Sequence, residues 1–260
     1  MNEKKTISIV VIIIAAGLGG YLYWHYNQPK PAPVQVQVKL PPKPEVRQVL
    51  EPPSAPLPAL AESDSFMLDA LAGLVNNKSL MSFFHTERLI RNIVATIDNL
   101  PDRKVAMRVM PVRQAPGHFL TAGTESDLTI SSQNAARYTT YVKIAEVIDT
   151  KKLIELYVRL YPLFQQAYEE LGYPKKYFND RLIVVLDNLL AAPDIKEPVR
   201  LVQPNVYYLY ADPDLEARSI GQRILMRMGS KNEAKIKAKL REIKQELLLH
   251  MHEQKVESAK

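Results

Sequence analysis

The chain has 260 residues, 47% of them hydrophobic, and a net charge of +6 from 34 Lys and Arg against 28 Asp and Glu. It contains no cysteine, which excludes disulfide frameworks, thiolate zinc sites and cysteine nucleophiles. The excess charge lies in one segment, because residues 218–246 hold nine basic and three acidic residues, whereas residues 1–217 hold 23 of each. The basic character therefore belongs to the carboxy-terminal part of the chain.

Residues 6–26 contain no Asp, Glu, Lys or Arg and predict a membrane-spanning helix of about 31 Å. Aromatic residues, including Trp24, gather at its far end, as is typical of a headgroup boundary. A cleaved signal peptide is the alternative, because Lys4 and Lys5 precede an apolar run with small residues. The apolar stretch continues well past those residues, so we expect a membrane anchor over residues 1–27 with a cytoplasmic amino terminus.

The next segment, residues 28–58, holds ten of the chain's 19 prolines. This composition prevents a helix or a central strand and predicts an extended, solvated linker. At roughly 3.1 Å per residue the linker reaches at most about 95 Å. It would hold the following domain well clear of the membrane.

A multi-helix globular domain is predicted over residues 59–250, with a disordered tail over residues 251–260. Ser63 or Asp64 is expected to cap its first helix, and Thr86 its second. A further short helix is expected over residues 105–109. Residues 114–132 are rich in Gly, Thr, Ser and Asp and predict a loop or a small β-hairpin. The fold class is therefore mainly α.

Two long helices joined by a tight turn are predicted as the core of this domain. Gly172 is expected to end the first helix, and Asn179 or Asp180 to cap the second. The buried faces follow helical spacing. They are formed by Leu153, Leu156, Tyr157, Leu160, Phe164, Ala167, Tyr168 and Leu171 in the first helix, and by Leu182, Ile183, Leu186, Leu189 and Leu190 in the second.

Prolines punctuate residues 193–210, which predict an irregular crossing before two final helices. Asp212 and the proline after it predict a helix start, and this helix is expected to run to Met228. Ser230 and Glu233 form the pattern of a capping box at the start of the last helix. That helix has one narrow apolar stripe, formed by Ile236, Leu240, Ile243, Leu247 and Met251.

Five segments carry a resemblance to a known family: LYPLFQQAYEELGYP from Leu160, YFNDRLI from Tyr177, LVQP from Leu201, YADPDLEARSIGQ from Tyr210 and RMG from Arg227. Over about residues 57–245 the chain resembles an uncharacterised bacterial family of membrane-anchored proteins, known only as a domain of unknown function. The resemblance implies an amino-terminal anchor, a proline-rich spacer and a mostly helical envelope domain. It implies no activity and assigns no catalytic residue.

Metal and cofactor sites are not expected. The five histidines form no His-x-x-x-His pair that would bring two imidazoles to one helix face. The sequence also lacks a glycine-rich phosphate loop and a Gly-x-Ser-x-Gly nucleophile elbow.

One polar cluster has two interpretations. Asn179, Asp180 and Arg181, with the preceding glutamates and Arg137, could line an acidic site of an envelope enzyme. Alternatively, Asn179 or Asp180 caps a helix and Arg181 pairs with a carboxylate. We favour the structural interpretation, because the adjacent carboxylates Glu169 and Glu170 diverge by about 100° on a helix and do not form an acid–base pair.

The basic residues Lys235, Lys239, Arg241 and Lys244 also have two interpretations. They could recognise an anionic partner, or they could form a solvated helix face. We expect a non-catalytic binding or scaffold protein, anchored in the bacterial inner membrane through residues 6–26, with its globular domain in the periplasm and a protein or an anionic envelope component as its partner. The absence of a recognisable nucleic-acid-binding module argues against a nucleic-acid partner.

Overall fold

The computed structural model describes residues 56–75, 82–104 and 107–257. The predicted membrane anchor over residues 6–26 and nearly all of the predicted linker lie outside these ranges. Within them, no helix has both the length and the apolar character needed to cross a membrane.

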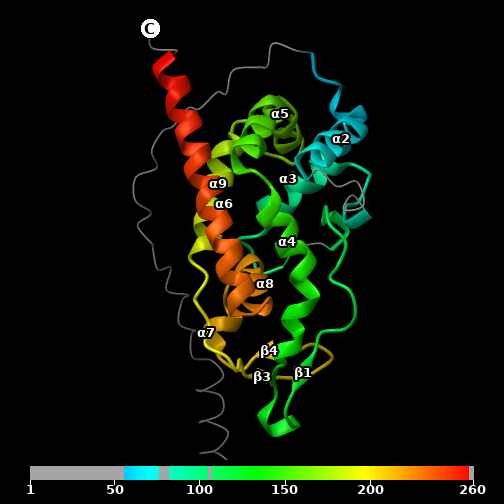
Figure 1. Ribbon diagram of the computed structural model, residues 1–260, viewed down its shortest axis with the longest axis vertical. Coiled ribbons are helices and arrows are strands. Elements are labelled where there is room, and N and C mark those ends of the chain that lie inside the picture. Colours follow the sequence, from blue (N-terminus) through cyan, green and yellow to red (C-terminus); the bar gives the residue numbers. More distant parts are fainter. Residues whose placement is uncertain (1–55, 76–81, 105–106, 258–260) are drawn as a thin grey trace, which may run out of the picture. The chain divides into compact units, whose positions relative to one another are not determined.

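The part of the chain that the structure describes is mainly helical, as predicted, and contains two short antiparallel hairpins (Figure 1). Its α-helices are α2 (Asp64–Val75), α3 (Leu89–Asn99), α4 (Thr139–Val147), α5 (Thr150–Glu170), α6 (Phe178–Leu190), α7 (Pro213–Glu216), α8 (Ile220–Arg227) and α9 (Ser230–Glu257). Its strands are β1 (Thr121–Ala122), β2 (Thr129–Ile130), β3 (Leu201–Val202) and β4 (Leu209–Tyr210). Helix α9 thus continues into the range 251–260, where a disordered tail was predicted.

Helix α5 lies at the centre of the larger hydrophobic core, where it packs mainly against α3 and α9 (Figure 1). Its predicted face is buried at Leu160, Phe164 and Tyr168, as the helical spacing requires. Leu171 departs from the prediction, because it is 41% exposed just beyond the end of the helix. The neighbour of α5 in sequence, α6, packs against it less extensively than α3 and α9 do.

A second core cluster joins α4, α6 and α8, and α9 contributes to both clusters. Gly221 allows the close approach of α8 to the end of α3. A Cβ atom at this position would lie 2.5 Å from Leu189 Cδ2 and 3.1 Å from the carbonyl oxygen of Leu100. The same carbonyl accepts the Gly221 N–H at 3.0 Å, so the two helices meet through their backbones.

The two hairpins associate with each other. In the first, Thr121 pairs with Ile130, so of the loop or small hairpin predicted over residues 114–132 the hairpin is present. The predicted irregular crossing contains the second, in which Leu201 pairs with Tyr210. The Leu201 N–H donates to the Leu128 carbonyl at 2.7 Å, and this hydrogen bond links the two hairpins. Tyr210 is buried beside Met226 of α8, which anchors the hairpins to the helices.

Two predicted helix caps are wrong for the same reason. Helix α3 begins at Leu89 rather than after Thr86. The N–H groups of Arg88 and Leu89 at its start donate to the Asp64 carboxylate of α2. Helix α6 begins at Phe178, so Asn179 and Asp180 lie inside it. The Phe178 N–H donates to Gln165 Oε1 at 2.8 Å. In both cases the acceptor comes from a distant helix instead of the local sequence.

The carboxy-terminal helices show one confirmed cap and two departures. Asp212 accepts the Asp214 N–H at 2.8 Å and caps α7, as predicted. The helix predicted to run to Met228 is interrupted, because Ser219 caps a separate helix, α8. The predicted capping box at the start of α9 is also wrong. The Ser230 N–H donates to Glu197 at 3.1 Å, and the Glu233 N–H already bonds the carbonyl of the residue preceding Ser230.

Candidate functional site

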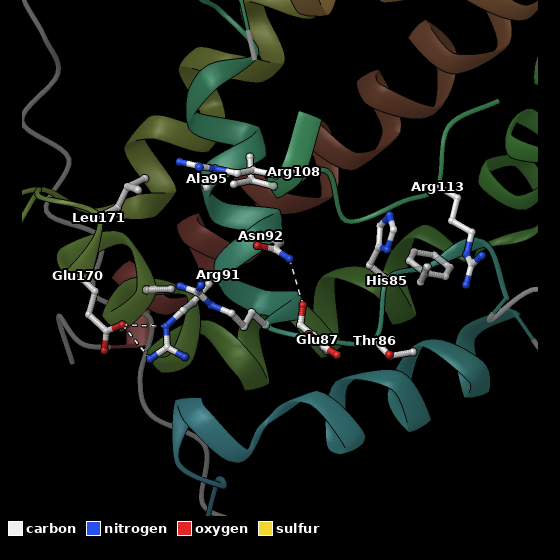
Figure 2. A pocket seen from close by; sticks show the side chains of 14 residues that line it. His85, Thr86, Glu87, Arg91, Asn92, Ala95, Arg108, Arg113, Glu170 and Leu171 are labelled. Carbon is white, nitrogen blue, oxygen red and sulfur yellow. Dashed lines mark hydrogen bonds and ion pairs between the residues drawn. The ribbon is translucent and has the colours of Figure 1, made fainter. Parts of the chain in front are cut away.

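An open pocket of about 600 Å³ lies among the described residues (Figure 2). We call it the arginine pocket. It lies among the segment before α3, the exposed face of α3, the segment 108–113 and the end of α5. Its lining consists of Phe84, His85, Thr86, Glu87, Arg88, Arg91, Asn92, Ala95, Arg108, Val109, Arg113, Ala167, Glu170 and Leu171.

One wall of the arginine pocket is a short antiparallel pairing of two loops. Phe84 and Val112 form an isolated β-bridge. The His85 N–H donates to the Pro111 carbonyl at 2.9 Å, and the Arg113 N–H donates to the Phe83 carbonyl at 2.8 Å. The pairing fixes the backbone from which the His85 and Arg113 side chains extend on the same side of the pocket (Figure 2).

A second contact holds the other part of this loop on α3. The Thr96 hydroxyl donates to the Val109 carbonyl at 2.8 Å. This bond lies next to Arg108, whose side chain reaches over Ala95 (Figure 2). Arg108 is therefore attached to a backbone that is tied to the helix.

The start of α3 supplies Arg88 and Arg91. Arg88 has a left-handed backbone with φ of 53°, which is uncommon for a residue with a Cβ atom. Asp64 supports this conformation by accepting the N–H groups of Arg88 at 2.6 Å and Leu89 at 2.7 Å. One turn later, Arg91 donates to Glu170 of α5 through Nε at 3.0 Å and pairs with it through Nη2 at 2.9 Å.

The pocket lining is positively charged. Four arginines face two glutamates, Glu87 and Glu170, which leaves a formal excess of two positive charges without counting His85. Glu170 is already paired with Arg91, and the hydrogen bond from Arg91 lowers the pKa of its carboxyl group. In the part of the chain that the structure describes, the side chains of Arg88, Arg108 and Arg113 have neither an ion-pair partner nor a hydrogen-bond acceptor.

Besides His85, Thr86 and Asn92, five apolar side chains line the pocket. They are contributed by Phe84, Ala95, Val109, Ala167 and the exposed Leu171. A pocket that combines charged groups with apolar side chains can orient a ligand while contacting its neutral part. Among the described residues, no group of His, Asp and Glu is arranged to hold a metal ion. The chemistry available at this site is anion binding by guanidinium groups.

The predicted polar cluster around Asp180 is divided between structural roles. Asn179 is fully buried and accepts a hydrogen bond from the Tyr157 hydroxyl. Arg181 Nε donates to Asp98 Oδ1 at 2.7 Å, which confirms the expectation that Arg181 pairs with a carboxylate. Asp180 is exposed in the first turn of α6.

Tyrosines surround this cluster in the core. Burial raises the pKa of the Tyr157 and Tyr161 hydroxyls, because the phenolate form is poorly solvated there. Burial likewise raises the pKa of Tyr168 to about 12. These hydroxyls remain protonated at neutral pH, and those of Tyr157 and Tyr161 donate to Asn179 and Gln165.

Arg137, the other predicted member of the cluster, binds a different part of the chain. Its guanidinium donates to the carbonyls of Pro116 at 2.9 Å and Gly117 at 3.0 Å, and to the Asn134 side chain at 3.1 Å. These bonds hold the loop before β1 against the start of α4. None of the hydrogen bonds described for Arg137 connects it with Asp180 or Arg181.

Most of the predicted basic face on α9 takes part in contacts between helices. Lys235 pairs with Glu146 of α4 at 2.9 Å, and Lys244 pairs with Asp187 of α6. Lys239 donates to the carbonyl of Ile148 and to the hydroxyl of Thr150 at the start of α5, each at 3.2 Å. Arg241 is exposed. These lysines therefore attach α9 to three neighbouring helices.

Sequence reasoning missed the arginine pocket because the charge of the first 217 residues sums to zero. A local signal was present nevertheless. Residues 82–113 hold six basic residues against three acidic ones. The spacing of these residues in the sequence does not show that Arg91 and Arg113 face a common cavity. The loop between them returns against α3 only in the folded domain.

Comparison with known proteins identifies a family for the chain. A family model described as "Protein of unknown function (DUF3014)" matches residues 89–244, more than half of the chain. This match confirms the predicted membership of a family known only as a domain of unknown function. No curated protein and no solved structure matches the chain.

Proposed function

Because the chain belongs to the DUF3014 family, whose function is unknown, we propose from its own residues that it is a membrane-tethered binding or scaffold protein of the bacterial envelope. Residues 6–26 would anchor it in the inner membrane with the amino terminus in the cytoplasm. The proline-rich linker over residues 28–58 would then present the helical domain, residues 59–250, to the periplasm. The domain would bind a protein or an anionic envelope component without chemical conversion.

The arginine pocket is the observation that carries this proposal. It is open to solvent, and three of its arginines have no acidic partner within the described chain. Its one paired carboxylate, Glu170, has a lowered pKa and stays ionised at neutral pH, so it is a poor general acid. A cationic pocket whose paired carboxylate stays ionised supports the binding of an anion.

The enzyme alternative around Asp180 has less structural support. Its neighbours Asn179 and Arg181 are already hydrogen-bonded to Tyr157 and Asp98 in the core. Under the alternative, Asp180→Asn should abolish function without a change in stability. We expect instead that this substitution leaves partner binding unchanged and lowers stability by up to about 1 kcal/mol, because Asp180 lies at the positive end of α6.

Two experiments on the full chain test the proposed function. A reporter that is active only in the periplasm, fused after Lys260, should be active in bacterial cells. A photo-crosslinking residue at Leu171, in the pocket, should capture an envelope component in the same cells, whereas one at the similarly exposed Leu249 of α9 should not. An inactive reporter would contradict the envelope location, and equal capture at both positions would contradict the binding role of the pocket.

A further inference from the structure

We propose that the arginine pocket binds an organic dianion, a small molecule in which an apolar framework joins two carboxylate or phosphate groups. The inference rests on the proposed function, because it names the ligand class of the same pocket. It follows from the placement of the arginines, the support of their backbones by the fold, and the apolar side chains in the lining.

The cations lie at two separate places. Arg113 is on one side of the pocket. Arg108, which reaches over Ala95, is on the other side, where Arg91 pairs with Glu170 (Figure 2). Guanidinium groups present planar pairs of N–H donors that match the oxygens of a carboxylate or a phosphate. Cations at two sides favour a ligand with two anionic groups over one with a single charge.

The backbone beneath each unpaired arginine is fixed by a specific contact. The pairing of Phe84 with Val112 supports Arg113, and the bond from Thr96 to Val109 supports Arg108. Asp64 supports Arg88 through the N–H of that residue at 2.6 Å. Fixing these positions in advance reduces the entropy that must be lost when a ligand binds.

The backbone conformation of Arg88 also indicates that the pocket is a functional site. A left-handed conformation at a residue other than glycine is unfavourable, and such conformations gather at functional sites. Here the conformation places an arginine at the pocket where glycine would fit the backbone more easily.

The size of the pocket and its apolar side chains favour an organic ligand. A volume of about 600 Å³ is within the range of small-molecule sites and exceeds what a single inorganic anion fills. Phe84, Val109 and Leu171 of the lining offer apolar contact to the framework of such a ligand.

The test is isothermal titration calorimetry on the full chain in neutral-detergent micelles. The probes are adipate with two carboxylates, hexanoate with one, and 1,6-hexanediol with none, so that framework length is constant. Adipate should bind with about tenfold or greater preference over hexanoate, and hexanediol should not bind. Raising the salt concentration should weaken adipate binding, because exposed charges are screened.

Variants identify the site. Arg113→Gln and Arg108→Gln should each weaken adipate binding by about tenfold, with melting temperatures unchanged. Arg200→Gln is the matched control, because Arg200 is 67% exposed and lies outside the pocket lining, and its affinity should stay within about twofold. Chemical shifts of the arginine Nε–H groups should move for the pocket arginines when adipate is added.

Pyrophosphate and vesicles of phosphatidylglycerol distinguish the sources of the anion. A compact dianion without a framework should bind more weakly than adipate, and vesicles should not compete for the pocket. Equal affinity for adipate and hexanoate, binding unaffected by both pocket variants, or binding to vesicles alone would overturn the inference. Cross-linking at Leu171 would still report on the proposed function in each of these cases.

Discussion

Asp64, the first residue of α2, accepts the backbone N–H of Leu89, the first residue of α3, at 2.7 Å. Its second carboxylate oxygen accepts the N–H of Arg88 at 2.6 Å. One side chain therefore caps a helix that begins 25 residues later and at the same time supports the left-handed residue before it. The start of α3 and the arginine pocket depend on this contact.

Asp64→Ala should lower the free energy of unfolding by about 1 to 2 kcal/mol, because the capping interaction is lost. Urea denaturation of the two proteins gives the difference directly. Asp69→Ala is the control, since Asp69 is an exposed acidic residue of the same helix, and its effect should stay below about 0.5 kcal/mol. Equal effects at the two positions would show that Asp64 does not act as a cap.

Arg88 allows the cost of its backbone conformation to be measured. Arg88→Gly should be more stable than Arg88→Ala by about 1 kcal/mol, because only glycine adopts a positive φ without a steric penalty. In a regular helical position alanine would be the more stable of the two. Thermal denaturation of both variants distinguishes these cases, and an alanine variant as stable as the glycine variant would argue against the left-handed conformation.

The centre of the core provides a test of packing. Leu160 is fully buried, so Leu160→Ala should cost about 2 to 5 kcal/mol of unfolding free energy. Leu249 of α9 is 51% exposed, and Leu249→Ala should cost less than about 0.5 kcal/mol. A cost below 0.5 kcal/mol at Leu160 would mean that the buried face of α5 is assigned wrongly.

The buried tyrosines predict a loss of stability at high pH. Burial raises the pKa of Tyr168 to about 12 in the folded protein, against about 10 in the unfolded chain. Since the folded pKa is the higher one, the contribution of Tyr168 is complete below pH 10 and is lost as the pH rises towards 12. Denaturation at pH 9 to 12 should show this decline, and Tyr168→Phe should make it shallower. A decline equally steep in the variant would assign it to other groups.

The helices that define the fold were predictable because their signals are local and repeat along the chain. The buried face of α5 follows its three-and-four spacing, and Asp212 caps α7 from the adjacent position. The caps at Leu89 and Phe178 were not predictable, since their acceptors come from Asp64 and Gln165 in other helices. Local sequence offered nearer polar residues, and tertiary contacts prevailed over them.

The candidate sites were harder to predict than the fold. The basic residues of α9 stand out in sequence, yet Lys235 and Lys244 are paired with acidic residues of α4 and α6. The pocket arginines are less prominent in sequence, but in the folded domain fewer of them are paired with acidic residues. Net charge along the chain therefore did not indicate where unpaired charge occurs, because pairing depends on which helices become neighbours.

The packing of α9 also bears on when the domain can fold. Leu247 and Met251 share one core with Leu60 and Leu71, so contacts from opposite ends of the domain must form together. A nascent chain cannot complete this core before residue 251 has left the ribosome. Such long-range closure slows folding and keeps the chain unfolded for longer during synthesis. In the proposed periplasmic location the domain would cross the membrane before it folds, and this delay would favour that step.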